Sequence, residues 1–186
     1  MINSTNLLPG MVDDNVEMFV QNNDLKVIHQ GKILEFSELP FSIISILEEA
    51  IESDHDAINA LMQMHPDSKI NRTKQFAMCR LGGLDYQADI INNTLQDGEY
   101  WPCPIHGNCA HEGILCKLPV INGQRLSKVD VRLLQLTATD KTNEVIAEII
   151  ELPLGAFHKI KKELYAFLGI QTKQEGTLLS KLYNLL

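Results

Sequence analysis

The sequence of 186 residues has no apolar run that approaches the roughly 20 residues needed to cross a bilayer. Its N-terminal segment, MINSTNLLPGMVDDNVE, lacks the basic stretch followed by apolar residues that marks a secretory signal. We therefore expect a cytoplasmic protein with no membrane segment. Hydrophobic residues make up 45% of the chain and charged residues 22%, which is enough apolar material for one domain or two small ones.

The chain also lacks the patterns that mark common enzyme classes. It has no glycine-rich phosphate loop, no nucleophile with a recognisable base and no catalytic carboxylate pair. The acidic group between Glu48 and Asp56 indicates a solvated helix face, because no histidine or lysine is paired with it. His111-Glu112 lacks the spacer and the C-x-x-C of a zinc deaminase. We therefore expect a protein that is not an enzyme.

Cysteine is scarce, with four residues in the chain, yet three of them fall within fourteen residues. Cys103, Cys109 and Cys116 follow the pattern C-x5-C-x6-C, among prolines and glycines that favour a wrapping loop. In a reducing compartment clustered cysteines more often bind metal or react than form disulfides. Cys79, at the end of an expected helix, is the natural fourth ligand. The predicted metal site then uses Cys79, Cys103, Cys109 and Cys116.

Zinc in a closed structural site is the metal that we expect here. An iron–sulfur cluster is the alternative, because it also takes four thiolates. The spacing is specific for neither, and it lacks the C-x2-C of common zinc ribbons. His106 or His111 could replace Cys79 in a site of three cysteines and one histidine. The remaining interpretation is four reduced thiols that bind no metal.

The residues before Leu118 predict an α+β module that contains this cysteine-rich loop. Strand patterns at Val16–Val20 and Leu25–Phe36, separated by turns at residues 22–24 and 29–32, predict a small antiparallel sheet of two or three strands. Helices are expected after it over residues 40–53, from Asp54 or Asp56, from a cap at Asn71 to Arg80, and over residues 85–93. The short polar connection 119–125 marks a domain boundary.

Charge is distributed unevenly between the two predicted domains. Residues 119–186 carry 9 Lys and Arg against 7 Asp and Glu, a net charge of +2. Residues 1–118 carry 7 against 17, a net charge of −10, which together give the −8 of the whole chain. The acidic total alone argues against a nucleic-acid binder, whereas the mildly basic second domain permits one with weak, salt-dependent non-specific affinity.

Four helices are predicted in the second domain. Ser127 can cap the first and Thr142 or Asn143 the second, which Leu152-Pro153 then ends. The third carries an apolar face at Phe157, Ile160, Leu164 and Phe167, with His158, Lys159, Lys161 and Lys162 on its other side, and it stops at Gly169. A leucine-rich helix follows over residues 172–186. Two short helices, a tight turn and a helix with a basic face are typical of a helix-turn-helix.

Residues 126–170 resemble the LuxR-type (GerE, NarL/FixJ-like) helix-turn-helix family without a gap. The residues that carry the resemblance are Leu126-Ser127, Asp130, Leu133-Leu134, Thr142-Asn143, Ile146-Ala147, Pro153–Phe157, Tyr165 and Leu168-Gly169-Ile170. The resemblance implies an all-α four-helix domain over residues 119–186. It also implies a sequence-specific transcription regulator that binds double-stranded DNA and can form a homodimer through its last helix.

The positions that match the groove-facing residues of the family are Thr142, Asn143, Gly155, Ala156, His158, Lys159 and Lys162. The ordinary interpretation of the lysines is a solvated helix face. Ala156 and Ile160 stand where the family has a hydroxyl and a histidine. These departures and the acidic total keep open an adaptor that uses the same fold for protein contacts, without specific DNA binding.

Overall fold

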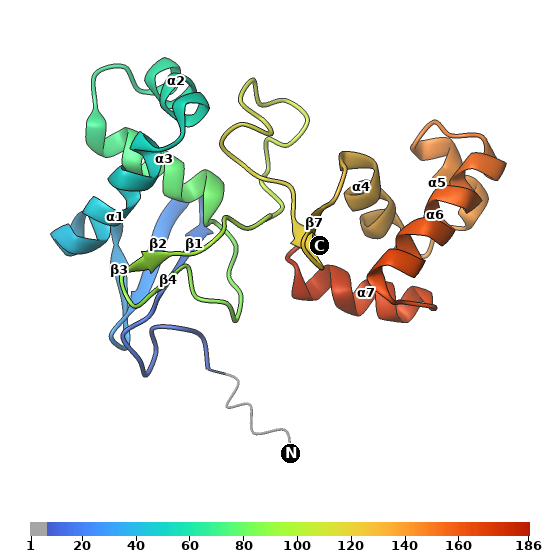
Figure 1. The fold of residues 1–186 in the computed structure, drawn as a ribbon, viewed down its shortest axis with the longest axis horizontal. Helices are drawn as coiled ribbons and strands as arrows, with labels where there is room; N and C mark the ends of the chain where they lie inside the picture. The colour runs from blue at the N-terminus through green and yellow to red at the C-terminus, as the bar shows by residue number, and fades with distance from the viewer. Residues whose placement is uncertain (1–6) are drawn as a thin grey trace. The chain divides into compact units, whose positions relative to one another are not determined.

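The computed structural model of the chain describes residues 7–186, so the first six residues of the segment searched for a secretory signal lie outside the described part. The chain divides into two compact units, Met1–Lys117 and Leu118–Leu186 (Figure 1). The boundary predicted from the sequence, between Leu118 and Pro119, lies one residue from this division. Among the helices of residues 7–186, none has the length and apolarity to span a bilayer.

The first unit is a mixed α+β structure with a small antiparallel sheet, as the sequence predicts. Its elements are β1 (Val16–Gln21), β2 (Asp24–His29), β3 (Lys32–Glu35), the 3-10 turn η1 (Phe36–Glu38), α1 (Phe41–Glu52), α2 (His55–Met64), α3 (Lys69–Arg80), β4 (Ile90–Ile91) and β5 (Thr94–Leu95). The sheet order is β3-β2-β1-β4-β5, and every neighbouring pair is antiparallel. Helix α3 contacts β1 and β2 (Figure 1).

Tight turns with left-handed residues connect these strands. Asn22 and Asn23, at φ 53° and 61°, join β1 to β2, and Gln30 and Gly31 join β2 to β3. Two-residue loops with both φ values positive match the right-handed twist of the flanking strands, and asparagine and glycine adopt them at low cost. Both turns were predicted from the sequence and are confirmed.

The three helices cover a single apolar core. Met18, Leu25, Leu47, Leu61 and Phe76 are among the side chains that are fully buried in it. Asp54 caps α2 by accepting from the Ala57 amide at 3.0 Å, as expected. The cap of α3 is Ser68 and not Asn71, because the helix begins three residues earlier than the sequence suggested.

The short helix expected over residues 85–93 is wrong. Asp85 instead accepts a hydrogen bond from the Gln87 amide at 2.6 Å, which turns the chain locally. Ile90 then pairs with Val16 of β1, and Asn92 and Asn93, at φ 49° and 59°, form the loop of the β4–β5 hairpin. Short-range turn chemistry and pairing with a distant strand therefore outweigh the helical pattern.

The second unit contains a small hairpin and four helices. Its elements are β6 (Val120–Ile121), β7 (Gln124–Arg125), α4 (Lys128–Thr137), α5 (Asn143–Ile149), α6 (Leu154–Leu168) and α7 (Lys173–Leu182). Ser127, Thr142 and Thr172 cap α4, α5 and α7 through their hydroxyl oxygens. Helix α6 ends at Gly169, whose φ of 69° is the left-handed conformation expected there.

Helices α4 to α7 enclose a core of their own. Leu133, Leu134, Ile146, Phe157 and Leu185 are at most 1% exposed in it. Helix α4 contacts α5 and α7, and α5 contacts α6. The connection between α5 and α6 is short: the Leu152 amide donates to Ala147 O at 2.9 Å, and Pro153 precedes the first turn of α6. This tight connection positions the start of α6 beside α5.

Candidate functional site

The residues predicted to face DNA lie at the beginnings of α5 and α6 and along α6. Thr142 is the N-cap of α5 and Asn143 is its first residue. Gly155 and Ala156 are exposed in the first turn of α6, and no atom lies near enough to Gly155 to contact a side chain there. A partner could therefore approach the α6 backbone closely at this turn.

The polar residues of α6 form an exposed surface next to these helix starts. His158, Lys159 and Lys162 are all exposed. His158 packs against Phe157 edge to face, with 5.4 Å between ring centroids, while Phe157 itself is fully buried. The buried Phe157 side chain packs α6 against the core, while the exposed side chains that follow it on α6 are accessible to a partner. We call the surface formed by Thr142, Asn143, Gly155, Ala156, His158, Lys159 and Lys162, of which only Asn143 is half-buried, the α5–α6 face.

A groove beside this face gathers further positive charge that the sequence did not single out. It has a volume of about 530 Å³ and runs along α6 between the first residue of α5 and the first residue of α7. Its lining residues are Asn143, His158, Lys161, Lys162, Tyr165, Ala166, Ile170, Gln171 and Lys173. We call it the lysine groove. Three of the seven predicted residues line it, Asn143, His158 and Lys162. The other four, Thr142, Gly155, Ala156 and Lys159, do not.

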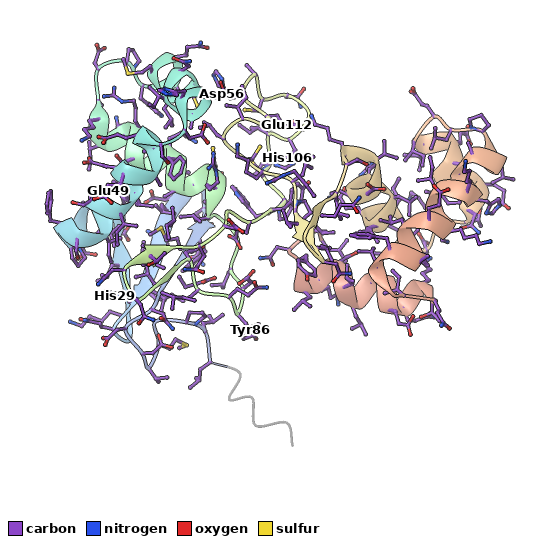
Figure 2. The ribbon with its side chains drawn as sticks, viewed as in Figure 1. His29, Glu49, Asp56, Tyr86, His106 and Glu112 are labelled. Carbon is purple, nitrogen blue, oxygen red and sulfur yellow. The ribbon has the colours of Figure 1, made fainter. Side chains whose placement is uncertain are left out.

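The four cysteines come from two parts of the first unit. Cys79 lies in the last turn of α3, and Cys103, Cys109 and Cys116 lie in the loop that follows β5, where Figure 2 labels His106 and Glu112. All four are half-buried free thiols. Backbone and side-chain donors approach the sulfurs: Gln75 Nε2 lies 3.2 Å from Cys79 Sγ and the Gly113 amide 3.3 Å from Cys116 Sγ.

The thiols lie near enough to affect one another electrostatically. Burial raises the pKa of the Cys79 thiol to about 11. The hydrogen bond from Gln75 lowers this pKa, and negative charge on the other three cysteines raises it. Burial also raises the pKa of Cys103. Within residues 7–186, no three His, Cys, Asp or Glu side chains already stand at the geometry of a metal site. The predicted metal site therefore remains a prediction.

His106 of the loop contacts an aromatic side chain, while the backbone carbonyl of His111 accepts from the Ile114 amide at 3.1 Å. His106 Nδ1 lies 3.1 Å from the Tyr100 hydroxyl, and the two rings meet edge to face with 5.1 Å between centroids. This contact holds His106 against the segment before the loop. Glu112 accepts from the Gly107 amide at 2.5 Å and closes the loop on itself.

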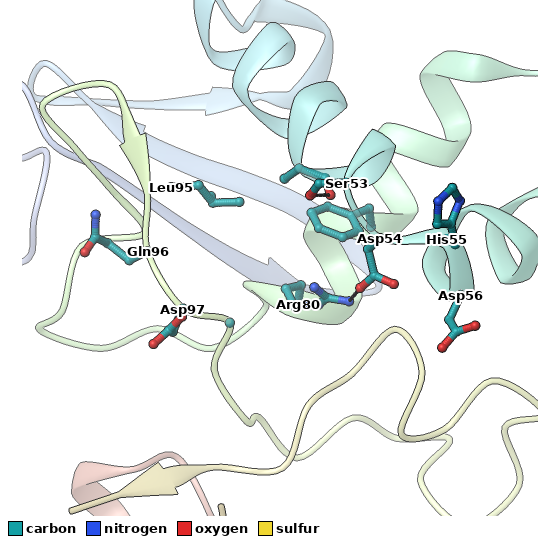
Figure 3. Close-up of a pocket in the computed structure, with 11 residues that line it drawn as sticks. Ser53, Asp54, His55, Asp56, Arg80, Leu95, Gln96 and Asp97 are labelled. Atoms are coloured by element: carbon teal, nitrogen blue, oxygen red, sulfur yellow. Dashed lines mark hydrogen bonds and ion pairs between the residues drawn. The ribbon is translucent and has the colours of Figure 1, made fainter. Parts of the chain in front are cut away.

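Arg80, next to Cys79 in α3, forms hydrogen bonds both to the loop that follows β5 and to the N-cap of α2. Its guanidinium donates to Leu115 O at 2.8 Å and to Asp54 Oδ2 at 3.1 Å. Arg80 and Asp54 both line a pocket of about 450 Å³ (Figure 3). Burial raises the pKa of Asp54, but the Ala57 amide, Arg80 and Lys117 outweigh it and hold the pKa below its usual range. Asp54 is therefore ionised and serves as cap and ion-pair partner.

Sequence reasoning missed a cluster of carboxyl groups in the first unit. Glu17 is 1% exposed on β1 and accepts from the Asp85 amide at 2.8 Å, and Asp89 is 5% exposed and accepts from the Met18 amide at 2.6 Å. Glu99 accepts from the Gly83 amide. These residues are far apart in the sequence, so no local pattern could have brought them together.

Burial raises the pKa of all three carboxyl groups and keeps Glu17 and Glu99 protonated at neutral pH. Burial raises the pKa of Glu17 to about 8. The hydrogen bond from the Asp85 amide lowers this pKa, and the negative charge of Asp85 raises it. Burial raises the pKa of Glu99 to about 9, helped by the charges of Asp85 and Glu17. The pKa of Asp89 is also raised well above its usual value, first by burial and then by the charges of Glu17 and Glu99.

The chain matches no protein-family model, no curated protein and no solved structure.

The carboxyl cluster predicts that alkaline pH destabilises the first unit. The folded state keeps protons that the unfolded chain has already released above its ordinary carboxyl pKa, so folding is linked to proton uptake. Stability falls as pH rises from the ordinary carboxyl range towards 8 to 9, by about 1.4 kcal/mol per pH unit for each carboxyl that stays protonated in the folded state. Urea unfolding at pH 6, 7 and 8.5, followed by circular dichroism, measures this slope.

Glu17→Gln and Glu99→Gln remove one titrating group each and flatten the dependence on pH. Glu49→Gln on the exposed face of α1 (labelled in Figure 2) is the matched control and leaves the slope unchanged. Equal slopes in the wild type and in both cluster variants would contradict the assignment.

Proposed function

We propose that the chain is a sequence-specific DNA-binding transcription regulator and that α5 and α6 form its helix-turn-helix. The single observation that carries this proposal is the α5–α6 face. It combines an exposed helix start without a bulky side chain at Gly155, exposed lysines along one helix, and a short connection to a second, capped helix. A helix presented in this way fits the major groove, while the start of the other helix lies against the backbone.

Within this proposal the residues have separate roles. Lys159 and Lys162 can donate to phosphate oxygens or to guanine, and Thr142 and Asn143 lie where a backbone phosphate would pass. Lys159 and Lys162 form no ion pair with a carboxylate in the part of the chain that the structure describes, so their charge is available for DNA.

Charge reversal at these lysines tests the proposal. Lys159→Glu with Lys162→Glu weakens binding to a duplex selected from random DNA by about 100-fold, if each lysine contributes about 1.4 kcal/mol. Fluorescence anisotropy with the full chain at fixed salt measures the loss. Arg132→Glu with Lys181→Glu makes the same change of charge on exposed positions of α4 and α7, and we expect a much smaller loss.

Failure to select any duplex would contradict the proposal. A partner protein that binds the wild type and the Lys159→Glu, Lys162→Glu variant equally well would favour the adaptor that the acidic net charge keeps open.

We also propose that Cys79, Cys103, Cys109 and Cys116 bind one metal ion, with zinc expected and an iron–sulfur cluster as the alternative. The electrostatic coupling among the thiols and the N–H donors near two sulfurs support it. Metal binding would draw the loop towards Cys79, so that part of the binding free energy stabilises the first unit.

Metal analysis of the purified full chain tests this site. We expect one zinc per chain, no visible absorbance, and a lower melting temperature after chelation because the loop loses its link to α3. Cys79→Ser abolishes the difference between the zinc-loaded and chelated melting temperatures, which separates metal loss from lost packing. A brown protein that contains iron would favour the cluster, whereas four titratable thiols with no metal would rule out both.

A homodimer is the third part of the proposal, and α7 is the surface that supports it. Leu178 and Leu182, four residues apart in α7, are 68% and 57% exposed, and Leu186, in the segment after the helix, is 47% exposed, although Leu185 is buried in the core. Two strongly exposed leucines on one face of a helix could form part of an apolar contact surface. A second copy that packs the same face against it would cover them.

Light scattering on the full chain tests the dimer. Leu178→Glu with Leu182→Glu places charge on the face and converts the protein to a monomer, since two like charges would then meet across the symmetry axis. Val129→Glu, at a 43% exposed valine of α4, is the control and leaves the mass unchanged. A wild-type protein that is already monomeric at micromolar concentration would overturn this part.

A further inference from the structure

The lysine groove concentrates positive charge on its lining residues. Lys161, Lys162 and Lys173 line it together with His158, and no acidic residue is among its lining residues. None of the three lysines forms an ion pair with a carboxylate in the described part of the chain. Glu175, close by in α7, uses its carboxylate to accept from the Gln171 and Thr172 amides at the start of that helix.

Lys161 is held in a fixed position at the centre of this groove. Its ammonium donates to Asn143 Oδ1 at 2.9 Å and lies 5.2 Å from the centroid of the Tyr165 ring and 5.9 Å from that of Phe157. An ammonium group has three N–H donors, and Asn143 takes one of them. Two donors therefore remain on a side chain whose position is already determined by its neighbours.

The surroundings of Lys161 do not favour its charge. Burial lowers the pKa of Lys161, and the positive charge of Lys173 lowers it further. Two lysines that repel each other at a half-buried site, with no carboxylate between them, would both be stabilised by an anion. The Tyr165 hydroxyl is buried there and has no hydrogen-bond partner among the described residues.

We propose that the lysine groove is a phosphate-binding site in which Lys161 and Lys173 neutralise one phosphate group. A phosphate suits the groove because its oxygens accept hydrogen bonds in several directions, and donors are present on Lys161, Lys173 and the Gln171 amide side chain. Lys162 and His158 belong both to the groove and to the α5–α6 face, so the site continues the proposed DNA interface.

The source of the phosphate is assigned to the DNA backbone, and this assignment rests on the proposed function. A phosphate beside the recognition helix contributes affinity and register but no sequence information. A free phosphorylated small molecule offers the same chemistry, and the two sources are separated by experiment.

The first arm measures the salt dependence of DNA binding by the full chain. The slope of log Kobs against log salt counts neutralised phosphates, at about 0.9 for each contact to B-DNA. Lys161→Gln and Lys173→Gln each reduce the magnitude of this slope by up to about 1 and weaken all duplex sequences about equally. Lys181→Gln, an exposed lysine of α7 outside the groove, leaves the slope unchanged. Lys173→Gln alone keeps the test valid if the loss of the Lys161–Asn143 contact disturbs the fold.

The second arm titrates inorganic phosphate into the full chain without DNA and follows backbone amide shifts of residues 170–173 by nuclear magnetic resonance. A reduced slope supports the site with DNA as the source. An unchanged slope with phosphate-dependent shifts that disappear in Lys173→Gln supports it with a free phosphorylated ligand. An unchanged slope and no shifts overturn it. If no duplex is selected at all, the proposed function fails, while the titration still decides on the phosphate site.

Discussion

Arg80 makes the contacts on which the arrangement of the first unit depends. Its guanidinium reaches Asp54, which caps α2, and the carbonyl groups of Ile114 and Leu115, which end the cysteine-rich loop. The same group stacks over Phe76 at 4.7 Å, within the apolar core. The planar guanidinium spreads its donors over separate nitrogens, so Nε and an Nη can reach groups that lie on different sides of it, whereas the donors of a lysine all sit on one nitrogen. Because Cys79 precedes it directly, Arg80 also fixes where the loop returns to α3.

The second unit depends on local signals, and for that reason much of it could be predicted from the sequence. Ser127, Thr142 and Thr172 accept hydrogen bonds from amides three residues ahead, and Gly169 adopts the left-handed conformation that ends α6. Each of these contacts involves residues within one helical turn. The same holds for the asparagine and glycine turns of the first unit. The mixed α+β class follows from such elements taken in order.

Features that depend on distant contacts could not be predicted. No local pattern indicates that Glu17 contacts a segment almost seventy residues away, since a lone glutamate in a strand pattern is usually exposed. The residues from Asp85 to Asn93 have a helical pattern, but pairing with β1 decides their structure. Lys161 looked like one of several solvated lysines. Its burial beside Lys173 depends on how α6 and α7 pack.

The protonated carboxyl cluster changes how the net charge of the chain should be understood. The formal charge of −10 over residues 1–118 counts Glu17, Asp89 and Glu99 as ionised, although burial raises the pKa of each. At neutral pH the first unit is therefore less acidic than its composition implies. This weakens the objection that an acidic chain would be repelled by DNA, because long-range repulsion depends on ionised groups only. The first unit loses stability as pH rises towards 8 to 9, because the unfolded chain has already released these protons, and the cluster ionises in the folded state only at the end of that range. Any effect of its negative charge on the proposed DNA binding would therefore appear at higher pH than the loss of stability.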